Sequence, residues 1–402
     1  MEERVYSSED RGVRRRAAWA LLTVLMLFGV VEATLRLAIG PPPLPSGVAR
    51  TQTLRLVQVA GGWVAKRGVD GQLRSFPKDI GLPRVGVLGG SSVMEAPIDK
   101  PENFPVWLQR ALPEVQVLNL GSPGASSSGL ALLAGELSVL NLDAVVVYTG
   151  HNDFGNLLMG GELDTSARWQ IRAQQFLAGS WVHAGLRRLV VREPVFALHL
   201  NTREDRLVFT QSDQAQLEQG LATERLITNL KVLAQDSSVP VLWVPPISNL
   251  HHAPQGLRSG DPDCMKMAAN MPRRRPERGE QRARELAKVC GVDTALGHWL
   301  RAHAAVARGD QAQALSHFKA SLALDPAPLR MPLSARQAEL ALAAELGQSA
   351  VDLWGEQPIW PATHFRDTLH FSSSGAQRVA ELIAPDLRAL LDLPAETQER
   401  QP

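Results

Sequence analysis

The segment RVGVLGGSS, residues 84–92, is a short apolar run that ends in two glycines and two serines. Two further runs, residues 115–120 and 144–148, have the same apolar character and are also followed by small or polar residues. Short β-branched and aliphatic runs, separated by segments of helical length, are typical of buried parallel strands that helices connect. The pattern therefore predicts an α/β fold.

The C-terminal part extends this pattern. Residues 239–244 follow a long helical stretch and predict a fourth strand, and residues 350–354 predict a fifth. A final helix is expected over about residues 373–391, with Ser372 or Ser373 as its N-cap. The chain should then form a doubly wound, mostly parallel five-stranded sheet with helices on both faces. In such sheets, chemistry belongs at the carboxyl ends of the strands.

Each of the first three predicted strands ends in a motif. The motifs are GGSS at 89–92, NLGSPG at 119–124 and GHND at 150–153, and a fourth, DTLHF at 367–371, precedes the final helix. Alone, each has an ordinary structural explanation, such as a tight turn or a structural histidine. Neither a GxGxxG nor a Walker pattern accompanies them. Because the carboxyl ends of parallel strands meet at one edge of a sheet, the four motifs together predict a single crevice.

In this order and with this spacing, the motifs resemble the blocks of the SGNH/GDSL hydrolase family. Ser91 falls where the family keeps its nucleophile, and Asp367 and His370 match its Asp-x-x-His block. The resemblance covers about residues 84–154 and 350–391, and it implies a flavodoxin-like α/β/α sandwich with a Ser91–His370–Asp367 catalytic triad. One departure is that Gly90 stands where family members often have aspartate.

The resemblance also implies an oxyanion hole. Gly124 falls where the family keeps a backbone N–H donor, and Asn152 falls on the asparagine of its Gly-x-Asn-Asp block. The backbone N–H of Ser91 would be the third donor. One such donor typically accounts for about a hundred- to thousandfold in rate. Residues 246–250, which follow the fourth strand, are expected to line the same crevice.

The chemistry of these residue types is consistent with the family roles. A serine hydroxyl is a weak nucleophile, so it needs a neighbouring base such as His370 to take its proton as it attacks. Asp367, three residues earlier, would hold the imidazole in the right tautomer and offset the imidazolium charge. Two rivals remain: Ser92 as the nucleophile, and His364 as the base, although no acid lies three residues before His364.

Composition bounds the remaining possibilities. The chain has 402 residues, of which 45% are hydrophobic and 21% charged, and its formal net charge is +1. This length is ample for a large core, and the near-neutral charge gives no reason to expect a nucleic-acid partner.

The two cysteines, Cys264 and Cys290, exclude a disulfide framework but leave one bridge open in an oxidising compartment. His251, His252 and Cys264 match no zinc spacing, so neither a metal nor a cofactor is predicted.

The N-terminal region carries a targeting signal. Residues 1–16 are rich in arginine, and residues 17–39 are almost wholly apolar, interrupted only by Glu32 and Arg36. A helix of this length is about 34 Å long and would cross a hydrocarbon core of roughly 30 Å. We therefore predict that residues 17–39 form a single-pass, uncleaved transmembrane anchor, with the N-terminus in the cytoplasm. The chain would contact the membrane through this helix, and a linker over residues 40–83 would follow it. The catalytic domain would be extracytoplasmic, or periplasmic in a Gram-negative bacterium.

The hydrolase domain is predicted to span residues 84–402, with an α-helical insertion at about 255–345. Within it, residues 295–327 match the tetratricopeptide pattern of a helical hairpin, with Gly309 near the turn and Pro326 after the second helix. A single such unit does not make a solenoid, so an ordinary helical hairpin is the simpler alternative. The hairpin is a candidate surface for a protein partner.

Three functions are compatible with these residues. The first is hydrolysis of an ester or an O-acylated carbohydrate through an acyl-serine intermediate. The second is O-acyl transfer to a cell-envelope polysaccharide, with the insertion shielding the acyl-enzyme from water. The third is a catalytically silent envelope scaffold. An inactive site has no chemical need for intact Ser91, Asn152, Asp367 and His370, which favours the first two functions.

Overall fold

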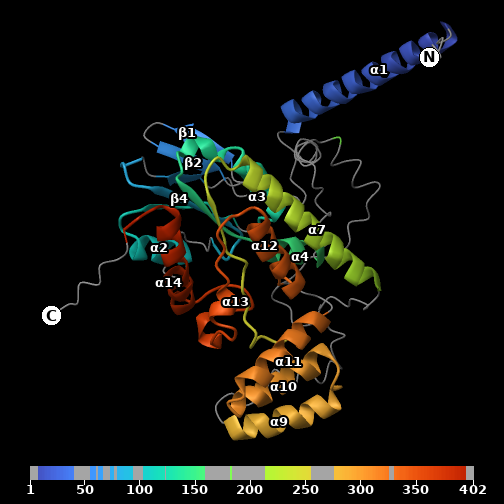
Figure 1. The fold of residues 1–402 in the computed structure, drawn as a ribbon. Helices are drawn as coiled ribbons and strands as arrows, with labels where there is room; N and C mark the ends of the chain where they lie inside the picture. The colour runs from blue at the N-terminus through green and yellow to red at the C-terminus, as the bar shows by residue number, and fades with distance from the viewer. Residues whose placement is uncertain are drawn as a thin grey trace, which may run out of the picture.

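The computed structural model describes residues 8–39, 55–59, 62–66, 73–76, 79–93, 103–122, 124–158, 182, 213–254, 276–325 and 330–394. A four-stranded parallel sheet lies at its centre, and its strands, in spatial order, are β5 (Gln116–Asn119), β4 (Arg84–Gly89), β6 (Ala144–Tyr148) and β7 (Val241–Trp243). β4 and β6 are buried along their whole length, which explains why their sequences are nearly continuous apolar runs. The predicted α/β class with a parallel sheet is confirmed (Figure 1).

The predicted fifth strand is wrong. Ala350 makes only an isolated parallel bridge to Trp243, in which the N–H of Val351 donates to the Trp243 carbonyl at 2.8 Å. The chain then enters a short helix, α13 (Leu353–Glu356), because the Asp352 side chain accepts hydrogen bonds from the first N–H groups of that helix. This cap ends the extended conformation after one bridge, so the parallel sheet has four strands among the described residues.

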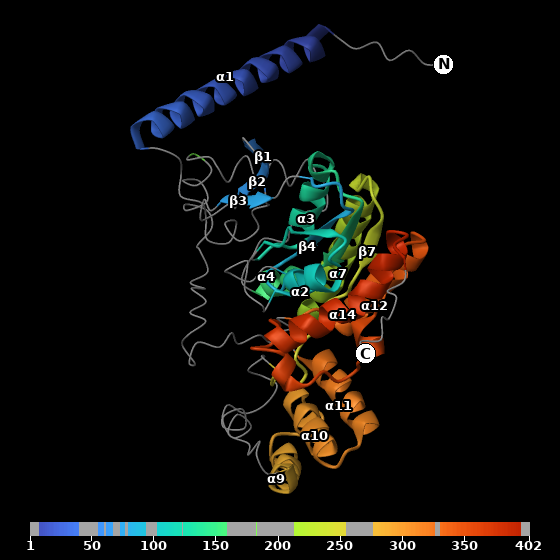
Figure 2. The ribbon, with the colours of Figure 1, turned by 90° about the vertical axis from the view of Figure 1, so that its left-hand side faces the viewer.

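Helices cover both faces of the sheet (Figures 1 and 2). One face is covered by α3 (Ser127–Ala134), α7 (Asp213–Asp236) and α12 (Leu333–Glu345), and the other by α2 (Phe104–Ala111) and α14 (Ser373–Leu390). Alternate residues of β6 supply the two cores, because Val145 and Val147 pack into the first layer and Val146 into the second. The predicted final helix and its Ser372 cap are confirmed, since Ser372 Oγ accepts a hydrogen bond from the N–H of Gly375.

A second, smaller sheet forms in the region predicted to be a linker. Its strands are β1 (Arg55–Val59), β2 (Gly62–Lys66) and β3 (Leu73–Phe76), and both pairings are antiparallel. The first of these strands, with the sequence RLVQV, is mainly apolar. Phe76 is buried and belongs to the core that α3 and α7 cover, so this sheet contacts the main domain.

The insertion forms a unit of three helices, α9 (Pro276–Val289), α10 (Ala295–Ala307) and α11 (Gln311–Leu324). The turn between α10 and α11 contains Gly309, whose φ of +79° favours glycine. The hairpin predicted at 295–327 is therefore present as α10 and α11. Its predicted tetratricopeptide-like character is not confirmed, and α10 packs against both α9 and α11 (Figure 2).

The N-terminal helix, α1, spans Ser8–Ile39 and contains the apolar stretch in which an anchor was predicted. Both Glu32 and Arg36 fall within this helix, and the Glu32 carboxylate accepts a hydrogen bond from the N–H of Val182. The predicted transmembrane helix is not found: within the described residues, no helix combines the length and the apolar character needed to span a bilayer.

Candidate active site

Two of the sequence motifs lie at the carboxyl ends of neighbouring strands. Ser91 follows β4, and Asn152 lies in the first turn of α4 (His151–Leu158), directly after β6. The chain leaves β4 toward β5 on one side and returns to form β6 on the other. The strand order therefore reverses between β4 and β6, and open α/β sheets bind their ligands in the crevice at such a point.

Three predicted residues form a hydrogen-bonded chain at this crevice. The distance from Ser91 Oγ to His370 Nε2 is 2.8 Å, and that from His370 Nδ1 to Asp367 Oδ2 is 2.7 Å. Both distances fit a tautomer in which Nδ1–H donates to Asp367 while Nε2 accepts the hydroxyl proton of Ser91. The arrangement can take a proton from Ser91 as it attacks an electrophile.

The loop that carries Asp367 and His370 holds the acid in its charged form. Asp367 Oδ1 accepts hydrogen bonds from the N–H groups of Leu369 and His370, both at 2.8 Å. Partial burial alone would raise the pKa of Asp367, but the hydrogen bond from the His370 ring and these two N–H donors lower it to about 2. Asp367 therefore presents a carboxylate to the imidazole at neutral pH.

Asn152 and Gly90 lie side by side at the strand ends. The Asn152 amide nitrogen donates to the carbonyl of Ala125 at 2.8 Å. A Cβ built on Gly90 would lie 2.2 Å from this nitrogen. The departure from aspartate at position 90 thus has a steric reason, because the space is taken by the Asn152 amide. A primary amide has two N–H donors, so one remains available to an oxyanion.

Gly124 lies in the turn that precedes Ala125. The N–H of Ala125 donates to the carbonyl of Ser122, and Gly124 has a φ of +75°, a conformation that favours glycine. The turn thereby brings the Ala125 carbonyl to Asn152, so Gly124 lies one residue from a direct contact of the site. It is not among the residues that line the pocket next to Ser91, and its role as an oxyanion donor stays a prediction.

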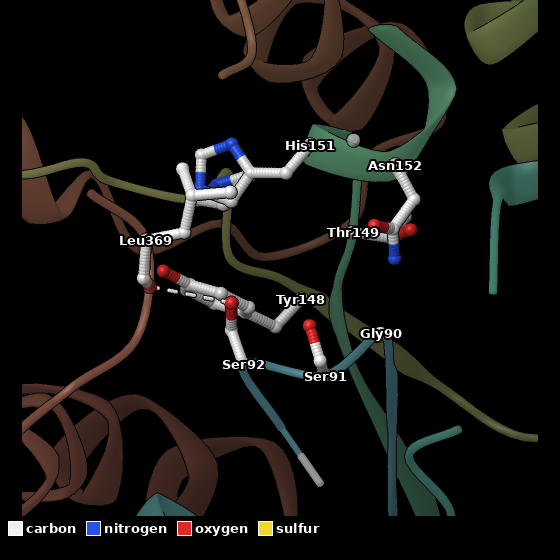
Figure 3. A pocket seen from close by; sticks show the side chains of 10 residues that line it. Gly90, Ser91, Ser92, Tyr148, Thr149, His151, Asn152 and Leu369 are labelled. Atoms are coloured by element: carbon white, nitrogen blue, oxygen red, sulfur yellow. Dashed lines mark hydrogen bonds between the residues drawn. The ribbon is translucent and has the colours of Figure 1, made fainter. Parts of the chain in front are cut away.

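Neither rival residue takes the predicted place of Ser91 or His370. The Ser92 hydroxyl donates to the carbonyl of Leu369 at 3.3 Å, as Figure 3 shows, and so it bonds the acid–base loop rather than the imidazole. His364 packs its ring edge-on against Trp360, with ring centroids 5.6 Å apart. Its neighbours therefore differ from those of His370, which contacts Ser91 directly.

A small pocket opens beside Ser91 (Figure 3). Its lining residues come from the ends of β4 and β6 and from two later loops, and they are Gly90, Ser91, Ser92, Tyr148, Thr149, Gly150, His151, Asn152, Pro246 and Leu369. Pro246 comes from the predicted lining segment 246–250. The Thr149 hydroxyl is buried and has no hydrogen-bond partner among the described residues, which leaves it available to a ligand.

His151 is a pocket residue that the sequence did not single out. Its Nε2–H donates to the Ile247 carbonyl at 3.0 Å, and its Nδ1 accepts from the N–H of Met331 at 3.0 Å. Complete burial, followed by the charges of neighbouring groups such as Arg330, lowers the pKa of His151 to about 4. His151 is therefore a neutral wall of the pocket. Its position inside the GHND motif was the one available signal.

The described part of the chain contains no group of three or more histidine, cysteine, aspartate or glutamate side chains that could hold a metal ion. His251, a ligand type noted in the sequence, packs against the rings of His303 and Phe318 instead, with centroid distances of 5.3 and 5.5 Å. Cys264 lies outside the described residues.

No protein-family model and no curated protein sequence matches the chain. It is similar to the crystal structure of TesA, with 14% identity over 76% of this chain and 99% of that chain and a TM-score of 0.33. A member of the lipolytic protein G-D-S-L family from Veillonella parvula DSM 2008 shares 11% identity, over 79% of this chain and 99% of that chain, with a TM-score of 0.33. AlinE4, an SGNH-hydrolase family esterase, shares 12% identity, over 78% of this chain and 98% of that chain, with a TM-score of 0.28.

TM-scores of 0.28 to 0.33 do not by themselves assign an activity. The function proposed below therefore rests on the geometry of Ser91, Asp367 and His370.

Proposed function

We propose that this protein is a serine ester hydrolase of the SGNH/GDSL type. The observation that carries the proposal is the chain of two short hydrogen bonds from Ser91 Oγ through His370 to Asp367. This is the arrangement that activates a hydroxyl for nucleophilic attack. An ester or an O-acylated carbohydrate is the substrate class that the motif resemblance favours.

The reaction proceeds in two halves. Ser91 Oγ attacks the ester carbonyl carbon as His370 Nε2 takes the hydroxyl proton, and the negative charge moves to the carbonyl oxygen. The N–H groups of Ser91 and Gly124 and the second amide N–H of Asn152 stabilise this oxyanion. When the tetrahedral intermediate collapses, the carbon–oxygen bond to the leaving alcohol breaks and His370 returns the proton to that alcohol.

The acyl-serine that remains is cleaved by water. His370 takes a proton from the water as its oxygen attacks the acyl carbon, and a second tetrahedral intermediate forms at the same donors. Its collapse breaks the bond to Ser91 Oγ, which regains the proton from His370 as the carboxylic acid leaves. Asp367 stays ionised throughout and offsets the transient imidazolium charge.

A fluorophosphonate probe tests this proposal because it reacts with activated serines without requiring the natural substrate. We expect the probe to modify Ser91, as located by peptide mass spectrometry. Ser91→Ala should lose labelling together with roughly a thousandfold or more of the activity on a short-chain aryl ester. Ser92→Ala is the comparison: it should still be labelled at Ser91, and its activity should fall far less than that of Ser91→Ala, because it removes only the hydrogen bond to the Leu369 carbonyl. Labelling of Ser92, or esterase activity that survives Ser91→Ala, would contradict the assignment.

We also propose that the domain acts outside the cytoplasm. The arginine-rich residues 1–16 precede an uninterrupted apolar run at 17–31, and a basic segment before such a run is typical of export signals. In addition, Cys290 is disulfide-bonded. Disulfides persist mainly in oxidising compartments. A C-terminal reporter that is active only after export should give a signal, and a reporter active only in the cytoplasm should not.

A further inference from the structure

The loop that follows β7 makes two hydrogen bonds to the loop that carries Asp367. The backbone N–H of Asn249 donates to the Thr368 carbonyl at 2.9 Å, and the Asn249 side-chain amide donates to the Asp367 carbonyl at 3.1 Å. Asn249 is 7% exposed, so these bonds are shielded from water. Both bonds act on the main chain of the acid itself and of the residue after it.

These two bonds connect the loop that carries Asp367 to the rest of the domain, which the hydrogen bonds within that loop do not. The carboxylate of Asp367 bonds only to Leu369 and His370 in the contacts described above, which fixes the acid relative to its own base. Placement of the pair relative to Ser91 requires contacts with the rest of the domain. The Ser92 hydroxyl bonds one side of the loop at the Leu369 carbonyl, and Asn249 bonds the other side.

Asn249 is itself held in one conformation. Its Oδ1 accepts a hydrogen bond from the N–H of His251 at 3.0 Å, which forms an Asx turn. Its carbonyl accepts from Arg330 Nη1 at 3.2 Å. Arg330 is 3% exposed, and its Nη2 lies 3.4 Å from the carbonyls of His252 and Ala253, so one buried guanidinium binds the whole turn.

The helical insertion supplies the remaining contacts of this turn. Trp299 of α10 donates its indole N–H to the Leu250 carbonyl at 3.2 Å. Arg330 forms a buried ion pair with Asp325, the residue that caps the end of α11, at 3.8 Å. A continuous set of contacts therefore leads from the α10–α11 hairpin through the 249–253 turn to the backbone of Asp367.

We propose that Asn249 is a positioning residue for the acid–base pair, and that the helical insertion acts on the reaction by clamping the turn that carries Asn249. This inference rests on the proposed esterase function. It assigns the insertion a role in catalysis through support of the Asp367 loop. A displacement of about 1 Å in a supporting element is enough to reduce the rate substantially, because proton transfer needs aligned donors and acceptors.

The test removes one hydrogen-bond donor at a time by substitution. Asn249→Asp keeps the oxygen that accepts from His251 and removes the amide N–H that binds Asp367. We expect about a tenfold loss both in kcat on a short aryl ester and in the rate of Ser91 labelling by a fluorophosphonate, with KM unchanged. Trp299→Phe should lower both rates in the same direction by about threefold. Gln348→Glu is the matched amide-to-acid control, because Gln348 accepts from Trp243 at the opposite side of the sheet, and it should leave both rates within about twofold.

A double-variant cycle separates positioning from a general structural role. If Asn249 acts through Asp367, adding Asn249→Asp to Asp367→Asn should cost less than about twofold beyond Asp367→Asn alone. Multiplicative losses, or an Asn249→Asp protein that labels at the wild-type rate, would overturn the inference and leave the esterase function standing. Absence of Ser91 labelling in the wild type would instead overturn the esterase function, and the positioning role with it.

Discussion

The amide of Asn152 occupies the space that a side chain on Gly90 would need. The clash distance of 2.2 Å between a built Cβ and the Asn152 nitrogen is far below a van der Waals contact. Asn152 is held there by its hydrogen bond to Ala125. Glycine at position 90 is therefore coupled to the proposed oxyanion donor, although the family that the motifs resemble often has aspartate there.

Gly90→Asp should consequently lower the activity instead of improving the match to the family. The new Cβ would displace the Asn152 amide, and the loss of one oxyanion donor costs about a hundred- to thousandfold in kcat. The melting temperature should change little, because the displaced atom is the end of a side chain. Steady-state kinetics would check this, with Asn152→Ala as the reference, and the double variant should be no worse than Asn152→Ala. An active Gly90→Asp enzyme would show that Asn152 is not a donor in this position.

The strands and the motifs at their ends could be predicted because both depend on local sequence. β4 and β6 have the short apolar runs of buried strands, and Ser91, Asn152, Asp367 and His370 are recognised by their spacing within short blocks. The structure then brings Ser91 to within 2.8 Å of His370, although 279 positions separate them in the sequence. The prediction of this contact came from the resemblance of the motifs to a family triad, because His370 lies in the loop before α14 and not at the end of a strand.

The features of the fold and the site that could not be predicted from the sequence depend on long-range contacts. Residues 350–354 have the apolar character of a strand, but whether they pair along their length depends on the Asp352 cap and on the single bridge to Trp243. Asn249 and Arg330 look like ordinary polar loop residues until the fold buries them together. His151 would be recognised as a neutral residue only from its two backbone partners, which lie at Ile247 and Met331.

Asp367→Asn should abolish most of the activity while leaving the loop intact. An asparagine oxygen can still accept from the N–H groups of Leu369 and His370, so the amide nitrogen would face His370 Nδ1. That contact stabilises the wrong tautomer, with the proton on Nε2, which cannot accept a proton from Ser91. We expect kcat to fall by up to about ten-thousandfold with a nearly unchanged melting temperature. A loss below about tenfold would mean that Asp367 does not orient the base.

Glu339 should destabilise the folded protein at neutral pH. It is fully buried in α12, and neither carboxylate oxygen has a hydrogen-bond partner within the described structure. Burial first, and then the charge of Asp153, raise the pKa of Glu339 well above its usual value. As the pH rises above about 4.5, the unfolded chain releases this proton while the folded chain retains it, so stability falls with pH.

Glu339→Gln should therefore raise the free energy of unfolding by about 1 kcal/mol or more at pH 7, and by less at pH 5. Urea unfolding at the two pH values would measure this difference. Glu345→Gln, at the exposed end of the same helix where Glu345 pairs with Lys231, is the control and should show no such gain. An equal effect of Glu339→Gln at both pH values would mean that Glu339 is ionised in the folded state.

His151 should make the free energy of unfolding increase with pH in the acidic range, which is opposite to the effect of Glu339. The folded protein keeps this ring neutral, with a pKa of about 4, because it is buried and because its two nitrogens are committed to Ile247 and Met331. The unfolded chain binds a proton near the ordinary histidine value of 6.5, so the folded state gains nothing from this group above that pH and loses stability below it. The loss amounts to about 1.4 kcal/mol per pH unit, or roughly 3 kcal/mol between pH 6.5 and 4.

His151→Gln isolates this contribution, since a glutamine can accept from Met331 and donate to Ile247 without binding a proton. Urea unfolding of the wild type and the variant should show that the variant is equal or less stable at pH 7, because a flexible amide replaces a well-packed ring. Its relative stability should then improve by roughly 3 kcal/mol as the pH falls to 4. A constant difference between the wild type and His151→Gln across this range would mean that the folded protein protonates His151, and that the wall of the pocket beside Ser91 carries a charge in mild acid.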